Sequence, residues 1–406
     1  MDRGIKVTDD ITWVGVNDYD TDLFEAIWPL PRGVSYNAYL IDDEKVALMD
    51  TVKAGFTSGL LDTLNRHLGG RPVDYLVINH MEPDHSGAVA ILRRMCPDMR
   101  IVGNAKTAGF LKEFYGITEG VHEVADGDTL ELGRHKLEFH LTPMVHWPET
   151  MMTYDRPDKV LFSGDAFGGF GALPGGIFDD EVDTANFMDE TLRYFSNIIG
   201  KYCRTTQKAI AKLADLDIGI VAPTHGPVWR AEPRRIIELY ERWSRQETEP
   251  GVVIVYGSMY GNTETMAHAV ARELAERGVE KVRVHNVSRT HASFIINDIW
   301  RFNGFVFAGP TYNTSLFPLM DDFLRLIVNM PLTDRHVGIV GTQSWSGGGV
   351  KAIREYAETA KWNVVEPVVE AKCSPTEDDL DACRQLGANL AEAVTDTSGR
   401  SDGRGQ

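Results

Sequence analysis

The sequence predicts an α/β protein with two different domains, a β-sandwich with a few helices and then a doubly wound parallel sheet. The chain of 406 residues is long enough for two domains. Residues 1–247 carry many short β-rich runs, whereas residues 251–395 alternate regularly between strands and helices. Between them, residues 245–250 form a charged stretch that ends in proline and is suited to an interdomain link. Residues 396–406 contain nothing apolar to bury, and we expect a disordered tail there.

Several β-rich runs of the first domain end in a histidine or an aspartate. The runs are residues 45–50, 73–80, 136–144, 159–165 and 217–225. Loops at strand ends commonly present functional groups. The pattern therefore predicts that such side chains gather at one edge of the sandwich.

The second domain begins with an apolar strand at residues 252–257, followed by an amphipathic helix over residues 262–277. Met266, Val270 and Leu274 lie four residues apart on one face of that helix, and Gly278 is suited to end it. The remaining predicted strands are residues 281–287, 304–309, 336–341 and 365–372. Five strands joined by crossover helices form a doubly wound parallel sheet.

The composition excludes several classes of partner and site. The formal net charge of −18 argues against a nucleic-acid surface, because phosphate binding needs clustered Lys and Arg. No apolar run approaches the roughly 20 residues that cross a bilayer, and residues 1–10 do not resemble a signal peptide. We therefore expect a cytoplasmic protein without a membrane partner. The four cysteines form no CxxC pair, so any metal is expected to be held by nitrogen and oxygen.

The densest group of metal-competent side chains follows the run at residues 73–80. Four of them fall within six residues: His80, Glu82, Asp84 and His85. Three further candidates lie at the ends of later runs: His146, Asp165 and His225. A single loop histidine has many other roles, but seven candidates in short loops favour a metal site.

Three loops of the second domain predict a ligand site, because they follow strands at the edge where open α/β sheets bind ligands. The helix start after Gly261 and the hydroxyls of Ser258 and Thr263 are suited to a phosphate, and Trp345 and Tyr312 to a flat ring. The full predicted set is Ser258, Met259, Tyr260, Gly261, Asn262, Thr263, Pro310, Thr311, Tyr312, Asn313, Thr314, Ser344, Trp345, Ser346, Gly347 and Gly348.

The HxExDH spacing from His80 to His85, with the later His, Asp and His, resembles the ligand set of flavodiiron proteins. Their metal domain has the metallo-β-lactamase fold, an αββα sandwich, in which most hydrolases carry HxHxDH and bind zinc. Glu82 replaces the second histidine here, and more oxygen donors suit non-haem iron. The resemblance implies two irons with a bridging oxygen species. It assigns His80, Glu82 and His146 to one iron, Asp84, His85 and His225 to the other, and Asp165 to the bridge.

Two further residues are candidates for catalytic roles through the same resemblance. Tyr194 matches a region where family members place a tyrosine near the irons, so it is predicted either to donate a proton or to pack in the core. Glu25 falls where several members have a histidine over the irons, which puts in doubt a proton-donor role carried over from them. Trp147 is expected to pack against the site.

The second domain resembles flavodoxin and implies FMN as its ligand. The loops offer a place for one terminal phosphate, and the sequence has no P-loop lysine. Tyr260 stands where flavodoxins commonly have threonine, which weakens a side-chain contact to the phosphate.

Together the two resemblances imply an oxidoreductase that reduces O2 to water, NO to nitrous oxide, or both. Electrons would pass through FMN from an external donor such as rubredoxin, a flavin reductase or reduced deazaflavin, since no rubredoxin-like CxxC pairs follow. The resemblance also implies a head-to-tail homodimer or a dimer of dimers. Two alternatives stay open, a zinc hydrolase fused to a flavodoxin-like domain and a flavin protein with a merely structural sandwich. The choice between O2 and NO also stays open, with a preference for O2.

Overall fold

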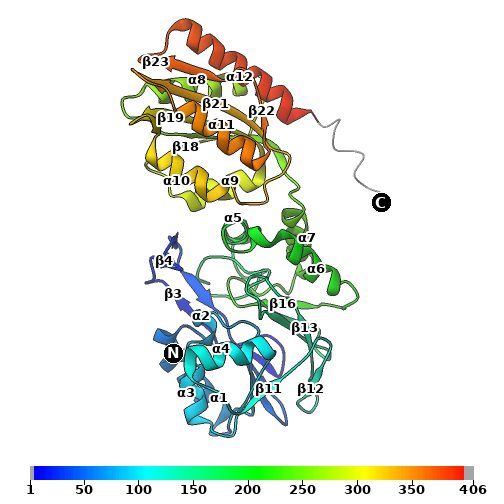
Figure 1. Cartoon of the computed structure of the whole chain (residues 1–406). Coiled ribbons are helices and arrows are strands. Elements are labelled where there is room, and N and C mark those ends of the chain that lie inside the picture. The colour runs from blue at the N-terminus through cyan, green and yellow to red at the C-terminus, as the bar shows by residue number, and fades with distance from the viewer. Residues whose placement is uncertain (1–3, 397–406) are drawn as a thin grey trace. The chain divides into compact units, whose positions relative to one another are not determined.

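The computed structural model describes residues 4–396, which divide into two compact units on either side of the Arg245–Gln246 bond (Figure 1). We call residues up to Arg245 the first unit and residues from Gln246 the second unit. The predicted link at residues 245–250 is partly a strand, because β17 (Glu249–Tyr256) begins inside it. The predicted domain limits at 247 and 251 stay predictions, and the predicted tail lies outside the described residues except for Asp396. None of the helices in the described part combines the length and apolar character needed to cross a membrane.

The first unit contains two sheets. The seven-stranded sheet has the order β1 (Ile5–Lys6), β2 (Ile11–Trp13), β7 (Tyr39–Asp42), β8 (Val46–Met49), β9 (Tyr75–Val77), β10 (Arg100–Gly103), β11 (Val121–Glu123). The five-stranded sheet has the order β12 (Thr129–Glu131), β13 (Lys136–Leu141), β14 (Met151–Asp155), β15 (Val160–Gly164), β16 (Ile220–Pro223). Two small two-stranded sheets pair β3 (Val16–Asp18) with β6 (Val34–Tyr36) and β4 (Leu23–Phe24) with β5 (Trp28–Pro29). Each predicted β-rich run contains one of these strands.

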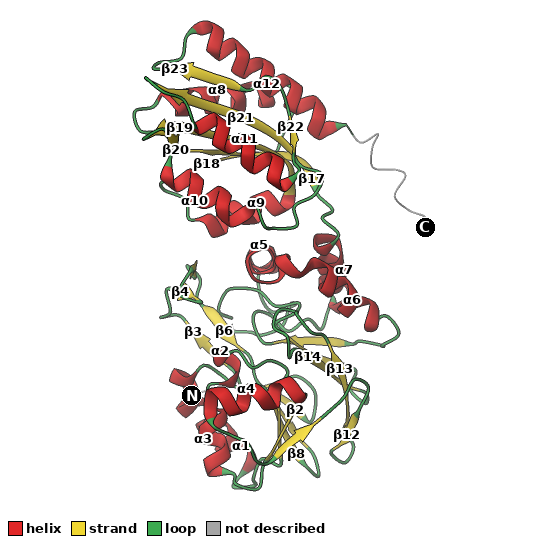
Figure 2. Cartoon of the chain, viewed as in Figure 1, coloured by secondary structure: helices red, strands yellow, loops and turns green. Residues whose placement is uncertain are grey.

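The two sheets pack face to face around one apolar core. Ile41 and Val77 from the first sheet share this core with Phe139 and Phe162 from the second. The helices of the unit are shown in Figure 2, and α2 lies in the loop after β9, at the edge of the sandwich. They are α1 (Thr57–Leu68), α2 (Pro83–Ser86), α3 (Val89–Met95), α4 (Ala105–Tyr115), α5 (Thr184–Tyr194), α6 (Cys203–Lys212) and α7 (Pro233–Ser244). Short turns of 3-10 helix at Ala54–Phe56 and Gly200–Tyr202 and of π-helix at Phe195–Ile199 complete the unit. The predicted αββα sandwich is confirmed.

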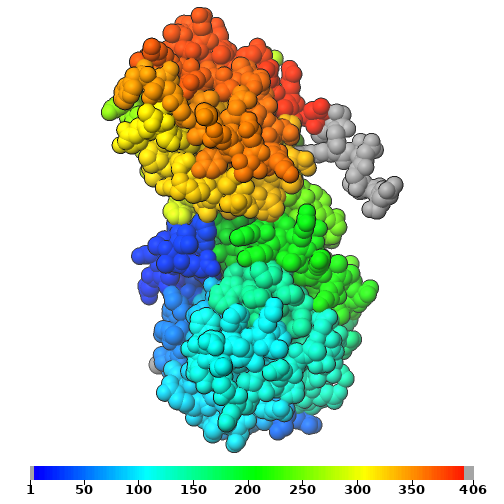
Figure 3. All heavy atoms as spheres, viewed as in Figure 1, coloured from blue at the N-terminus to red at the C-terminus, as the bar shows by residue number. Residues whose placement is uncertain are grey.

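Segments far apart in the sequence lie side by side at one edge of this sandwich. The backbone N–H of Asn37 donates to the carbonyl of Thr224 at 2.7 Å, and the N–H of Gly171 donates to the carbonyl of Gly33 at 3.1 Å. The contact of the blue and green segments of the first unit is visible in Figure 3. These contacts bring the loops after β9, β15 and β16 to the same edge. The sequence analysis predicted this from the His and Asp residues at the ends of the β-rich runs.

The second unit is a parallel sheet in the order β18 (Val282–Asn286), β17, β19 (Phe302–Tyr312), β21 (His336–Gln343), β22 (Asn363–Val364). Two strands extend it, β20 (Ser315–Leu316) against β19 and β23 (Val369–Lys372) against β21. Its helices are α8 (Asn262–Glu276), α9 (Ala292–Arg301), α10 (Pro318–Ile327), α11 (Gly349–Ala360) and α12 (Glu377–Thr395). The predicted doubly wound sheet is confirmed.

Two details of the second unit test the sequence reasoning. Met266, Val270 and Leu274 of α8 are fully buried, as their four-residue spacing predicted. The strand predicted at residues 365–372 forms only in its second half, as β23 (Val369–Lys372), and β22 ends before it at Val364. Pro367 lies in the gap and has no N–H to donate to a neighbouring strand, which accounts for the break.

Candidate metal centre and flavin cavity

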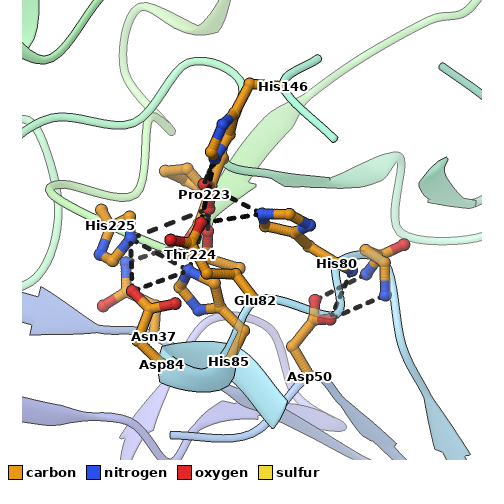
Figure 4. A network of polar contacts seen from close by, with 12 residues as sticks. Asn37, Asp50, His80, Glu82, Asp84, His85, His146, Pro223, Thr224 and His225 are labelled. Atoms are coloured by element: carbon orange, nitrogen blue, oxygen red, sulfur yellow. Dashed lines mark hydrogen bonds and ion pairs between the residues drawn. The ribbon is translucent and has the colours of Figure 1, made fainter. Parts of the chain in front are cut away.

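The seven predicted metal ligands come together in two adjoining groups at the closed edge of the first unit. Figure 4 labels these ligands except Asp165. The first group is His80, Glu82, His146 and Asp165, and the second is Asp84, His85 and His225. Within each group the potential ligand atoms lie within 4.8 Å of one another. The fold therefore brings together the seven side chains that the sequence analysis selected as candidate metal ligands.

The loop after β9 is built to hold its side chains in place. Glu82 occupies the N-cap position of the short helix α2, and Pro83 takes the first helical position, where its missing N–H is not needed. The buried carboxylate of Asp50 accepts hydrogen bonds from the backbone N–H and the side-chain amide of Asn79, at 2.7 and 2.8 Å. These bonds fix the backbone just before His80.

In the first group, four side chains meet through their outermost atoms. Nε2 of His80 lies 3.2 Å from Oε2 of Glu82, and Nε2 of His146 lies 3.1 Å from the same oxygen. Nε2 of His146 is also 3.1 Å from Oδ2 of Asp165. Imidazole and carboxylate atoms therefore converge on one small space.

In the second group, Nε2 of His85 lies 3.0 Å from Nε2 of His225 and 3.0 Å from Oδ1 of Asp165. Oδ2 of Asp84 is 3.4 Å from Nε2 of both histidines. Asp165 thus directs Oδ2 to the first group and Oδ1 to the second. A carboxylate in this position suits a bridge between two metal ions.

Two of the imidazoles are oriented by hydrogen bonds on the side away from the cluster. Nδ1 of His225 donates to the backbone carbonyl of Ser35 at 2.7 Å, and Nδ1 of His80 lies 2.8 Å from Oε1 of Glu149. In a neutral imidazole this leaves the lone pair of Nε2 directed into the cluster. The sequence analysis identified neither of these two hydrogen-bond acceptors, Ser35 and Glu149. Glu149 offered a signal as a carboxylate three residues after His146, whereas Ser35 acts through its backbone and offered none.

The electrostatics of the cluster fit a pair of cations. Burial alone lowers the pKa of a histidine, but the carboxylates nearby, Asp165 prominent among them, raise the pKa of His85 and of His146 to about 9. Burial would raise the pKa of Asp165, yet the imidazoles hold it well below its usual range. Both carboxylate oxygens of Asp84 are buried and accept no hydrogen bond among the described residues. The residues thus provide three carboxylates and four imidazoles for positive charge, which is the donor chemistry of a non-haem iron pair.

The two predicted catalytic candidates both lie beside this cluster. Tyr194 is fully buried, its ring centroid lies 5.5 Å from that of His225, and its hydroxyl makes no hydrogen bond among the described residues. Burial, with the negative charge of Asp165, raises its pKa well above the usual value, so it stays protonated. Glu25 is an exposed residue, but enclosure of its carboxyl group and the charge of Glu82 raise its pKa to about 7.

Trp147 packs against the cluster, as the sequence predicted. Its ring centroid lies 5.3 Å from that of His80, edge to face, and 6.5 Å from that of Phe114, with which it is stacked. These contacts enclose the first group on one side.

A third group of metal-competent side chains in the first unit is part of an ion-pair network. His135, Asp155 and Asp158 lie within ligand distance of one another. The guanidinium group of Arg134, however, pairs with Asp158 at 2.7 Å and with Asp10 at 2.9 Å. Because Arg134 already pairs with Asp158, and His135 lies 3.1 Å from Asp155, this group is a structural ion-pair network.

The second unit has a cavity of about 310 Å³ at the carboxyl ends of its parallel strands. The N-terminus of α8 opens onto it, and Oγ of Ser258 accepts a hydrogen bond from the N–H of Gly261 at 3.0 Å. Thr263 and Thr342 pair through their hydroxyls at 2.9 Å on the cavity wall. No charged side chain is among the described residues that line this cavity, so a phosphate would be held by hydroxyls and backbone N–H groups.

The cavity wall includes most of the predicted ligand-binding residues. Three of the predicted set do not line it: Gly261, Gly347 and Gly348. Three lining residues were missed by the sequence reasoning: Thr342, Gln343 and Cys373. Trp345 and Tyr260 lie at the rim with 87% and 89% of their surface exposed, so flat aromatic faces are available to a ligand ring.

Known families match both units of the chain. Residues 34–226 match the family described as ODP family beta lactamase, and residues 254–387 match the flavodoxin family. A nitric oxide reductase of Moorella thermoacetica is 34% identical over 98% of this chain and 100% of its own length. An anaerobic nitric oxide reductase flavorubredoxin of Escherichia coli is 34% identical over 95% of this chain and 82% of its own length.

Solved structures match the same arrangement of a sandwich and a parallel sheet. The rubredoxin oxygen:oxidoreductase of Desulfovibrio gigas superposes with a TM-score of 0.93 at 29% identity, over 96% of this chain and 98% of that chain. The flavodiiron protein of Giardia intestinalis gives a TM-score of 0.93 at 27% identity, over 97% of each chain. With a two-group cluster of imidazoles and carboxylates in one unit and a flavodoxin-type cavity in the other, the chain belongs to the flavodiiron protein family.

Proposed function

We propose that this protein is an oxidoreductase that reduces NO and O2 at a diiron site, with electrons delivered through FMN. The observation that carries the proposal is the position of Asp165, whose two oxygens each face one group of ligand atoms. A hydrolase that uses a single zinc ion does not need such a shared carboxylate. The second unit supplies the flavin site, and its neutral cavity suits the single phosphate and flat ring of FMN.

The ligand assignment follows the two groups. His80, Glu82 and His146 would hold one iron, Asp84, His85 and His225 the other, and Asp165 the bridge. When bound, the iron pair supplies open coordination positions and electrons for the gas, and FMN supplies a store for electrons from the donor.

Protein groups beside the cluster supply positioning and protons. Reduction of either gas consumes protons, and the ligand side chains themselves are largely buried. Tyr194, whose hydroxyl has no hydrogen-bond partner within residues 4–396, would donate a hydrogen bond or a proton. Glu25, whose carboxyl lies near that of Glu82, would act beside the cluster, at the position where the family resemblance implies a histidine. The positive charge of a bound iron pair would lower the pKa of such a carboxyl group again and would favour the anionic form of Glu25.

The choice of gas leans towards NO. Two relatives that match nearly the whole chain at 34% identity are named nitric oxide reductases. O2 is the second candidate, because the D. gigas protein with the same fold is named an oxygen:oxidoreductase. The preference for O2 drawn from the sequence therefore becomes a preference for NO, with O2 as the alternative substrate.

Assembly, donor and compartment complete the proposal. Because the flavin and the irons occupy different units, a head-to-tail homodimer, alone or paired, would bring the flavin of one chain to the irons of the other. Rubredoxin, a flavin reductase or a reduced deazaflavin would serve as the external donor. The four cysteines are free, which agrees with the reducing cytoplasm as the compartment.

The test is a rapid-mixing experiment. Protein loaded with iron and FMN is reduced anaerobically and mixed with NO or with O2, and gas consumption is followed with product analysis. We expect nitrous oxide from NO at a higher turnover than water from O2. Protein that retains only zinc, hydrolyses esters and consumes neither gas would refute the proposal. Sedimentation of the loaded protein tests the dimer, and full turnover by a monomer would exclude it.

A further inference from the structure

We infer that Glu149 makes the two iron subsites unequal, because it holds His80 with a carboxylate where His225 is held by a neutral backbone carbonyl. The inference rests on the proposed function and adds to it a positioning residue outside the ligand set. We call the position of His80, Glu82 and His146 the first subsite, and that of Asp84, His85 and His225 the second subsite.

Glu149 is placed to act on His80 and on the loop that carries it. Its Oε1 lies 2.8 Å from Nδ1 of His80 and accepts the backbone N–H of Met81 at 2.9 Å. The side chains of Glu149 and His80 are both fully buried. One carboxylate oxygen therefore fixes the ring and the loop together, and Nε2 of His80 is left for the metal.

Other contacts hold Glu149 itself in position. Its backbone carbonyl accepts a hydrogen bond from the side-chain amide of Asn104 at 2.5 Å. Asn104 is the N-cap of α4, where its side-chain oxygen accepts the N–H groups of Lys106 and Thr107. The backbone of Glu149 is thus anchored to a helix, which helps to fix the position from which its carboxylate meets His80.

The second subsite has no equivalent carboxylate on an imidazole. Nδ1 of His225 donates to the uncharged carbonyl of Ser35, and Nδ1 of His85 has no hydrogen-bond partner among the described residues. The ligands themselves are matched in charge, because each subsite has one carboxylate of its own, Glu82 or Asp84, and shares Asp165. Glu25, an exposed residue whose carboxyl lies near Glu82, is a further carboxyl group on the side of the first subsite, but no hydrogen bond joins it to an imidazole ligand among the described residues. Glu149 therefore adds its negative charge to one subsite.

The charge of Glu149 is little compensated by other protein groups. Among the described residues its one recorded ion pair is with His80, and its Oε2 has no hydrogen-bond partner. A carboxylate buried in this way is costly unless a positive charge lies nearby. An iron bound through His80 supplies that charge, and the carboxylate in turn makes the imidazole a stronger donor.

The consequence is a difference in affinity between the subsites. Outer carboxylates of this kind typically change metal affinity by about 10- to 100-fold. We expect the first subsite to bind Fe(II) more tightly and to fill first. Loss of the charge should weaken the first subsite and leave the second nearly unchanged.

The test compares Glu149→Gln with the wild type and with a matched control. Glutamine keeps the shape of the side chain and the oxygen that accepts from His80 and Met81, and removes the charge. The control is Asp155→Asn. Asp155 lies 3.1 Å from His135, and this pair is another fully buried histidine–carboxylate pair of the first unit that contains none of the ligands. Full-length apoprotein is titrated anaerobically with Fe(II) against a chelator, and diferrous samples loaded with ⁵⁷Fe are compared by Mössbauer spectroscopy.

For Glu149→Gln we expect one of two Fe(II) dissociation constants to rise by about 10- to 100-fold and one of two Mössbauer doublets to shift. For Asp155→Asn we expect both constants to stay within about threefold of the wild type. The inference is overturned if Glu149→Gln changes neither constant, changes both equally, or matches Asp155→Asn. Two identical iron environments in the wild type would overturn it as well, even if the variant does not fold. Wild-type protein that binds fewer than two irons would instead refute the proposed function.

Discussion

Removal of the indole of Trp345 should weaken FMN binding by an amount that follows from its exposure. The side chain is 87% exposed at the cavity rim, so one face is available to the flavin ring. An aromatic side chain buries about 200 Å² when fully enclosed, and covering one face removes about 100 Å² from water. At about 25 cal/mol per Å² this contributes about 2.5 kcal/mol. Ordering the side chain costs about 0.5 kcal/mol, which leaves about 2 kcal/mol, or roughly 30-fold in Kd.

The assay is titration of apoprotein with FMN, followed by the quenching of flavin fluorescence. Trp345→Ala should raise the Kd roughly 30-fold, and Trp345→Phe, which keeps a flat ring, should stay within about fivefold of the wild type. Tyr19→Ala removes an exposed aromatic residue of the first unit and should leave the Kd unchanged. If folded Trp345→Ala binds FMN within about threefold of the wild type, the indole does not stack on the ring and the reasoning is wrong.

Three further results are expected. Asp165→Asn removes the shared charge but keeps an oxygen, so iron content should fall below two per chain and gas consumption should be lost; metal analysis showing two irons with normal turnover would contradict the bridging role. Tyr194→Phe should lower turnover by about tenfold or more with iron content unchanged, and equal turnover would mean that the tyrosine only packs. Burial opposes the charged form of His135, but Asp155 outweighs burial and the nearby Arg134 and raises its pKa. The stability gained from this pair is therefore complete below pH ~6.5 and is lost as pH rises through the raised pKa. Asp155→Asn should accordingly lower the melting temperature more at pH 6 than at pH 9, and an equal loss at both would contradict the charge on His135.

Local signals in the sequence predicted much of the fold and the cluster. Each ligand stands at or just after a β-rich run, so the position of the metal site followed once the run ends were assumed to share an edge. Parallel strands joined by helices meet at one edge, which made the flavin loops predictable in the same way. Met266 and its neighbours at four-residue spacing identified the buried face of α8 for the same local reason.

The parts that could not be predicted depend on contacts between distant segments. Glu149 lies 69 positions from His80 in the sequence, and its place three residues after His146 does not indicate that it holds His80. Ser35 acts on His225 through its carbonyl, which every residue has. The two possible roles of Tyr194 could be separated only partly, because a buried tyrosine can both pack and donate. Its missing hydrogen-bond partner became visible only in three dimensions.

Cys373 offers a way to watch the flavin site from outside. It is the exposed member of the four cysteines and lies on the wall of the cavity, whereas Cys203 and Cys383 are buried and Cys96 is partly so. A thiol-reactive probe should therefore label Cys373 first in protein without FMN, and a bound flavin should shield it. The rate of alkylation would then report cofactor occupancy directly, in samples too dilute or too strongly coloured for absorbance.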